Sequence, residues 1–144
     1  LPSGGTIQKD YDYGYVTGGY GIYIYRITYT NNDGKVFEFS FKQVQDFCRE
    51  NGLKAVPQLY YGLAKDLIPD YPLEQHWHEA FLQCIKDKYN DKDCYMCTMN
   101  VPEEGCVVRI EKNGLEGYKQ KSNLFYEYET KQLDKGESNI EDEN

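Results

Sequence analysis

The sequence predicts an α+β fold in which antiparallel sheets pack against helices. Two helical patterns lie between segments that are typical of strands, and the strands are joined by short turns rather than by regularly alternating helices. The 144 residues are enough for one domain with a hydrophobic core. No apolar run approaches the roughly 18 residues that a membrane span needs, so we expect no membrane insertion.

The N-terminal part of the chain predicts a loop followed by a hairpin. Residues 1–19 contain five glycines and several tyrosines without a period, which predicts either a loop or a poorly anchored entry segment. The aromatic and β-branched segment 20–30 predicts a strand. Residues 31–34 read Asn-Asn-Asp-Gly and predict a turn, after which residues 35–39 form the return strand.

A first helix is predicted to begin at Ser40. Ser40 and Gln43 match a capping box, apolar residues then recur at helical spacing, and Gly52 ends the helix. Residues 56–61 predict a short extended segment. Residues 62–67 predict a turn or a short helix.

A second helix is predicted from Pro72 to about Tyr89, because proline suits a first helical turn. Its apolar face is expected to contain the following residues: Leu73, Trp77, Ala80, Phe81, Cys84 and Ile85.

The C-terminal part predicts a second pair of strands. After a loop through Asn100, residues 105–111 and 118–122 are predicted strands, joined by a turn over 112–117. Residues 124–132 fit either a helix or a strand. Residues 136–144 are acidic and polar, and we expect them to be disordered.

The composition is acidic and rich in tyrosine. The net charge is −8 and there are 15 tyrosines, so taken alone the charge argues against a nucleic-acid-binding surface. The start of the chain has no charged segment followed by an apolar one, so we expect no signal peptide. Because the sequence does not begin with Met, we expect a fragment or a processed product. Five cysteines without a secretory signal favour a reducing, cytoplasmic location.

Cys94 and Cys97 form the one cysteine pair with suggestive spacing. A Cys-x-x-Cys turn can present two thiolates to zinc, but a structural zinc site needs four ligands. Reduced thiols without metal are therefore the favoured interpretation, with zinc second and redox chemistry third. The residues available to complete a zinc site are Cys84, Cys106, His76 and His78.

Two short segments carry the residue types of a nucleotide site. Glu104 precedes Gly105 at the mouth of a predicted strand, where a carboxylate can meet a hard cation or the polar edge of a ligand. Lys119 and Lys121 are two residues apart on a strand, so both ammonium groups share one face and a phosphate would satisfy both. Taken singly, each pattern favours ordinary solvated charges over a ligand site.

The order of these segments resembles a known superfamily. EEGCVVRI followed by GYKQKS is similar to the fourth and fifth motifs of covalent nucleotidyltransferases, which include polynucleotide ligases and capping enzymes. The resemblance is closest to phage-type ATP-dependent RNA ligases, and it extends over YGIYIYRITYT, IQKDYDYGY, VPQLYYG, CYMC and ETKQLDKGE. It implies a nucleotidyltransferase domain with an ATP-grasp-like fold.

The resemblance also implies roles for individual residues. Glu104 would act on a divalent metal, Mg²⁺ or Mn²⁺, or on its waters. Lys119 and Lys121 would hold the ATP phosphates and offset charge at the α-phosphorus. Tyr25 would stack on the adenine, with Tyr23 as the second choice.

One motif of this superfamily does not occur in the sequence. The nucleophilic lysine lies in a Lys-x-Asp-Gly motif, and here Lys9-Asp10-Tyr11-Asp12 lacks the glycine and resembles a later loop. Residues 1–135 are therefore expected to be the C-terminal part of the domain. We expect this part to be unable to form lysyl-AMP by itself. Its unpaired sheet edges would favour self-association or pairing with the missing N-terminal part. Arg109 is expected on the strand face opposite Glu104.

Three functions are therefore open. The first is part of an RNA ligase that joins RNA ends in RNA repair, with ATP and RNA as partners. The second is a non-catalytic module that binds single-stranded nucleic acid through the tyrosine-rich strand and the paired lysines. The third is a small zinc-containing interaction domain built on Cys94 and Cys97.

Overall fold

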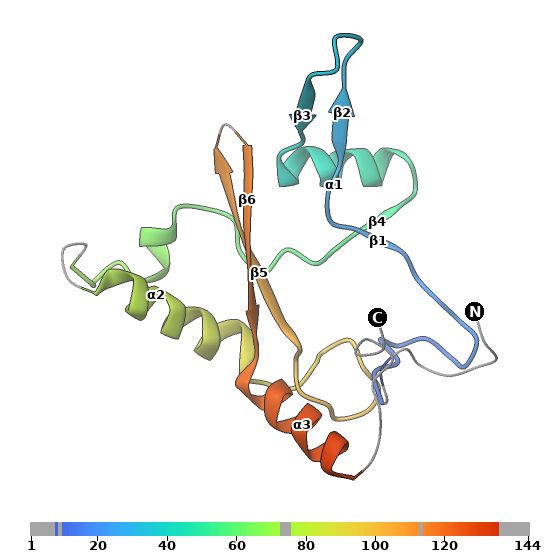
Figure 1. Ribbon diagram of the computed structural model, residues 1–144, viewed down its shortest axis with the longest axis vertical. Helices are drawn as coiled ribbons and strands as arrows, with labels where there is room; N and C mark the ends of the chain where they lie inside the picture. The colour runs from blue at the N-terminus through green and yellow to red at the C-terminus, as the bar shows by residue number, and fades with distance from the viewer. Residues whose placement is uncertain (1–7, 9, 73–75, 113, 136–144) are drawn as a thin grey trace. The chain divides into compact units, whose positions relative to one another are not determined.

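The computed structural model describes residues 8, 10–72, 76–112 and 114–135 (Figure 1). The chain divides into two compact units, which are treated separately below. Unit 1 comprises residues 1–19, 60–107 and 119–144, and unit 2 comprises residues 20–59 and 108–118. The described residues form an α+β fold, as predicted, with three α-helices and three two-stranded sheets.

Unit 2 contains two of these small sheets. β1 (Tyr23–Ile24) pairs in parallel with β4 (Lys54–Ala55), and β2 (Thr28–Thr30) pairs antiparallel with β3 (Val36–Glu38). The hairpin prediction is confirmed, but the predicted strand 20–30 is two strands. The reason is that its two ends pair with different partners. The parallel pair was not predicted, because β4 follows the helix and has only two residues.

Helix α1 (Phe41–Glu50) begins and ends as the sequence predicts. The Ser40 hydroxyl accepts from Gln43 N at 3.2 Å, and Ser40 N donates to Gln43 Oε1 at 2.8 Å. Gly52 lies just beyond the helix with φ +65°. The helix packs its apolar face into the core of unit 2, which is formed by Phe41, Val44 and Cys48 with Ile24, Ile27, Phe39, Ala55 and Val56 around them.

The helices of unit 1 include one whose start was predicted wrongly. After the 3₁₀ helix η1 (Ala64–Leu67), helix α2 spans Trp77–Ile85 and continues as a π-helix, η2 (Lys86–Asn90). It does not begin at Pro72, since His76 has φ +49°, which an α-helix does not accommodate. Leu73, predicted on its apolar face, lies outside the described residues.

The C-terminal part forms a hairpin and a helix. β5 (Gly105–Lys112) pairs with β6 (Gly114–Lys121), so the predicted turn over 112–117 is wrong and the strands extend further than expected. The ambiguous segment 124–132 is helical, within α3 (Asn123–Asp134). The hydroxyl of Ser122 caps this helix by accepting from Phe125 N at 3.2 Å. The predicted acidic tail, residues 136–144, lies outside the described residues.

The core of unit 1 includes a residue from the N-terminal segment. Tyr11 is 3% exposed and packs with Cys94, Val101 and Phe125. The described residues before β1 form a loop, as one of the two predicted alternatives had it, but the alternative of a poorly anchored segment is wrong around Tyr11, because an aromatic side chain fixes this part in a core.

Two further findings concern the cysteines and the length of the helices. All five cysteines lie in the described part and are free thiols. Within the same described ranges, the helices are all too short or too polar to cross a lipid bilayer.

Candidate functional site

The base of the β5–β6 hairpin brings the two predicted motifs together in unit 1. Ser122, which follows β6, donates its backbone N–H to the carbonyl of Glu104, which precedes β5, at 2.9 Å. The start of one strand therefore lies against the end of the other (Figure 1). Glu104 and Lys121, 17 residues apart in the sequence, flank this junction.

Gly105 makes this close approach possible. A Cβ atom at position 105 would lie 2.9 Å from Cα of Lys121 and closer still to the carbonyl oxygen of Gln120. Gly105 also has φ +141°, a backbone conformation that L side chains rarely adopt. The glycine after the glutamate is thus required by the fold, which sequence reasoning did not foresee.

The two lysines of β6 differ in their surroundings. Lys119 is exposed, whereas the Lys121 ammonium pairs with Glu129 of α3 at 3.1 Å. The same ammonium lies 5.1 and 4.9 Å from the ring centroids of Phe125 and Tyr126, within cation–π range. A phosphate that binds Lys121 must therefore share its ammonium with a carboxylate.

Glu104 is half-buried and is contacted by the N-terminal segment. The hydroxyl of Tyr13 donates to Glu104 Oε1. Tyr13 has φ +48° and Asp10 has φ +68°, both uncommon for residues other than glycine. Tyr11 between them holds the segment in place, since its hydroxyl donates to Pro102 O at 2.6 Å. One indication of this role is present in the sequence, which is the high tyrosine content of the N-terminal segment.

Asp12 ties the same segment to the loop before β5. Its carboxylate accepts from the Thr98 hydroxyl, from Thr98 N at 2.9 Å and from Gly14 N at 3.0 Å. These hydrogen bonds, that from the Thr98 hydroxyl first, lower the pKa of Asp12 below its ordinary 3.8.

The predicted cysteine pair, Cys94 and Cys97, lies in the loop before β5, and both thiols are free. Cys94 is buried, and its N–H donates to Val101 O at 2.8 Å. Burial, and then a hydrogen bond with Cys94, raises the pKa of the Cys97 thiol to about 12. Thiolates are the forms that bind metals and attack electrophiles. Among the residues that the structure describes, no group of three or more His, Cys, Asp or Glu side chains is placed to hold a metal ion.

The predicted adenine-stacking residues lie in unit 2. Tyr25, just after β1, is 69% exposed, while Tyr23 within β1 is half-buried. The Lys54 ammonium lies 5.4 Å from the ring centroid of Tyr23. Tyr25 therefore presents the more accessible ring of the two.

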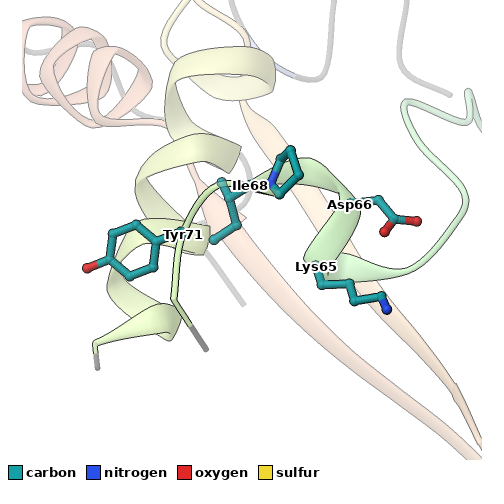
Figure 2. A pocket seen from close by; sticks show the side chains of 5 residues that line it. Lys65, Asp66, Ile68 and Tyr71 are labelled. Atoms are coloured by element: carbon teal, nitrogen blue, oxygen red, sulfur yellow. The ribbon is translucent and has the colours of Figure 1, made fainter. Parts of the chain in front are cut away.

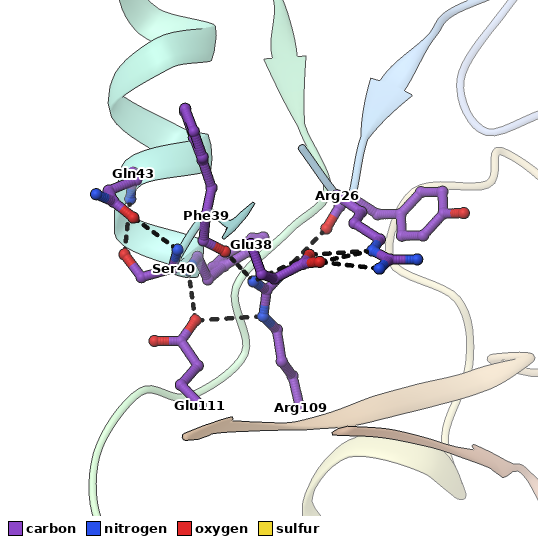
Figure 3. A network of polar contacts seen from close by, with 9 residues as sticks. Arg26, Glu38, Phe39, Ser40, Gln43, Arg109 and Glu111 are labelled. Carbon is purple, nitrogen blue, oxygen red and sulfur yellow. Dashed lines mark hydrogen bonds and ion pairs between the residues drawn. The ribbon is translucent and has the colours of Figure 1, made fainter. Parts of the chain in front are cut away.

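Arg109 also belongs to unit 2, where it joins a network of charged groups (Figure 3). Its Nη1 donates to Tyr25 O at 3.3 Å, and its Nη2 donates to Phe39 O. Its Nε lies 3.2 Å from Glu111 Oε1, and that oxygen accepts from the N–H of Phe41 at the start of α1. Sequence reasoning placed Arg109 on a strand face but assigned it no contact.

A pocket beside η1 contains none of the predicted site residues. It is lined by Lys65, Asp66, Ile68, Pro69 and Tyr71, whose charged and aromatic groups point in different directions (Figure 2). Nothing in this arrangement converges on a common ligand.

The comparisons with known proteins leave the site to be interpreted from its own residues. No family model matches the chain, and neither a curated protein nor a solved structure matches it significantly.

Proposed function

We propose that this chain is part of an ATP-dependent RNA ligase of the covalent nucleotidyltransferase type. The proposal rests on one observation in unit 1. The carboxylate of EEGCVVRI and the lysines of GYKQKS, which resemble the fourth and fifth motifs of that superfamily, flank the same end of the β5–β6 hairpin. A carboxylate beside two lysines suits a metal-bound triphosphate.

Each residue then has a role in nucleotide binding. Lys119 and Lys121 hold the ATP phosphates and offset charge that develops at the α-phosphorus. Glu104 binds Mg²⁺ or a water on it, which fits the habit of Mg²⁺ of using one or two carboxylates together with substrate phosphates. Tyr13 orients the Glu104 carboxylate through its hydroxyl. The resemblance assigns adenine stacking to Tyr25, which belongs to unit 2 and has an accessible ring there.

The covalent step needs a group that these 144 residues do not contain. No Lys-x-Asp-Gly sequence occurs in the chain, so a lysine from another polypeptide segment must attack the α-phosphate and release pyrophosphate. We expect no labelled protein band at 16.8 kDa after incubation with α-labelled ATP and Mg²⁺. A labelled band there would contradict this assignment of roles.

Nucleotide binding tests the proposal directly. Saturation-transfer NMR with ATP and Mg²⁺ is expected to show contacts to the adenine protons, and Lys119→Ala with Lys121→Ala is expected to weaken ATP binding. Glu129→Gln is expected to strengthen it, because it removes the carboxylate that competes for Lys121. Lys131→Ala is the matched control, since this lysine is on α3 and 73% exposed. Absence of ATP binding, or equal loss in the control, would refute the proposal.

A second candidate is a module that binds single-stranded nucleic acid without catalysis. Tyr29 and Phe37 form an exposed cross-strand pair with ring centroids 6.2 Å apart, and the Lys35 ammonium lies 5.2 Å from the Phe37 ring. Unit 2 also has seven Lys and Arg against six Asp and Glu, although the whole chain has a charge of −8. Salt-dependent RNA binding without ATP would favour this candidate.

A further inference from the structure

Tyr25 lies in the break between β1 and β2, where strand pairing is interrupted. The carbonyls of Ile24 and Ile27 on either side accept hydrogen bonds from backbone N–H groups, at 3.0 and 3.1 Å. The carbonyl of Tyr25 accepts from the side chain of Arg109 at 3.3 Å. A guanidinium group thus satisfies a carbonyl that a neighbouring strand would otherwise satisfy.

The guanidinium of Arg109 is itself held from several sides. Its side chain is 14% exposed and lies 5.9 Å from the ring centroid of Phe41. It donates to the carbonyl of Phe39 just after β3, and pairs with Glu111 on its own strand. Because a guanidinium is rigid and planar, these contacts fix the direction of the hydrogen bond to Tyr25.

Glu38 balances the charge of two arginines at this position. It accepts three hydrogen bonds from Arg26, at 2.9 to 3.1 Å, and its Oε1 lies 3.9 Å from Nη2 of Arg109 (Figure 3). Glu38 is 15% exposed. Without the charge of Glu38, the like charges of Arg26 and Arg109 would lose the carboxylate that both contact, and their repulsion would displace Arg109.

We propose that Arg109 and Glu38 are positioning residues for Tyr25. Arg109 fixes the backbone of Tyr25 through its carbonyl, and Glu38 keeps Arg109 in place against Arg26. The backbone of Tyr25 is consequently held in one conformation, and its exposed ring can stack on a base. This inference rests on the proposed function for its ligand, but the contact itself is tested without any ligand.

The first test measures the backbone around Tyr25 by amide NMR in the free protein. Arg109→Lys keeps the charge but loses the planar fork, and Glu38→Gln keeps the shape but loses the charge. Both are expected to shift the amide signals of residues 25 and 26 while leaving those of residues 44–50, the part of α1 beyond its first turn, in place. The matched controls are Arg49→Lys and Asp46→Asn, an exposed ion pair of the same type on α1, with an N–O distance of 2.6 Å. These control variants are expected to leave the amide signals of residues 25 and 26 unchanged.

The second test measures adenine contact in the same variants. With ATP and Mg²⁺, Arg109→Lys and Glu38→Gln are expected to weaken binding about tenfold, whereas both control variants bind as the unaltered chain does. If the unaltered chain binds no ATP, the proposed nucleotide site fails. The amide signals then still decide whether Arg109 and Glu38 position Tyr25.

A third measurement needs no substitution and covers variants that fail to fold. In the unaltered chain, ¹⁵N-labelled arginine is expected to give separate Nη signals for Arg109, because its hydrogen bonds hinder rotation of the guanidinium, and averaged signals for Arg49. Averaged Arg109 signals would overturn the proposal. So would unchanged amide signals at residues 25 and 26 in both folded variants.

Discussion

Gly105→Ala tests the physical reason for the glutamate–glycine pair at the start of β5. The added methyl group would lie 2.9 Å from Cα of Lys121, well inside the 3.4 Å at which ordinary van der Waals contact begins, and closer still to Gln120 O. Both neighbours are backbone atoms of β6, so no side-chain rotation relieves the contact. We therefore expect the base of the hairpin to separate.

The expected loss of stability follows from two contributions. A non-glycine residue at a strained positive φ costs about 1–3 kcal/mol. Forcing an extra methyl group into a packed backbone contact costs a further ~1–3 kcal/mol. The free energy of unfolding should therefore fall by about 2–6 kcal/mol, a large share of the ~5–15 kcal/mol typical of a domain.

Urea unfolding followed by tryptophan fluorescence measures this loss. Trp77 is the single tryptophan of the chain and lies in α2 of unit 1, the unit that also contains Gly105. Gly18→Ala is the matched control, because Gly18 is in the same unit and has φ +82° with no atom within 4 Å of an added Cβ. The control should lose only about 1–3 kcal/mol for its backbone conformation. Equal midpoints and slopes for the two variants would refute the steric argument.

Three further predictions concern other parts of the chain. Phe125→Ala removes a side chain that is 2% exposed in the core of unit 1, and should lower the unfolding free energy by about 3–5 kcal/mol in the same fluorescence assay. Ser40→Ala removes the cap of α1 and should cost about 1 kcal/mol, measured by circular dichroism; no change would contradict the capping box. Asp12 has a lowered pKa, so its ionised form stabilises the fold above its ordinary value of 3.8, and this contribution disappears as the pH falls through the lower, folded-state value. The free energy of unfolding of Asp12→Asn, measured across an acid titration, should therefore lack this part of the pH dependence. A pH profile equal to that of the unaltered chain would argue against the hydrogen bonds that Thr98 donates to Asp12.

Much of the local structure was predictable because it depends on neighbouring residues. The capping box of Ser40 and Gln43, the glycine after α1 and the turn at residues 31–34 each involve groups a few positions apart. Short-range sterics and hydrogen bonds decide these features, and they are present in the sequence itself. The pairing of Lys119 and Lys121 on one strand face follows from the same local periodicity.

The predictions that were wrong depended on distant partners. The predicted strand over 20–30 divides because its ends pair with β4 and β3, and the loop around Tyr11 is anchored by Phe125, more than 100 residues away. Propensity favours an extended backbone in such a segment but does not choose which strand it pairs with. Those choices are made by tertiary packing.

The sequence by itself determined the α+β fold class, the order of the segments around Glu104 and Lys119, and the residue types on which the proposed nucleotide site rests. Only the tertiary structure decided that Gly105 lets β5 meet the backbone of β6, that Glu129 pairs with Lys121 and that Arg109 supports Tyr25. The physical reason is that these are contacts between residues 8 to 84 positions apart in the sequence. Steric exclusion and charge pairing act through space, and the chain order alone does not contain those distances.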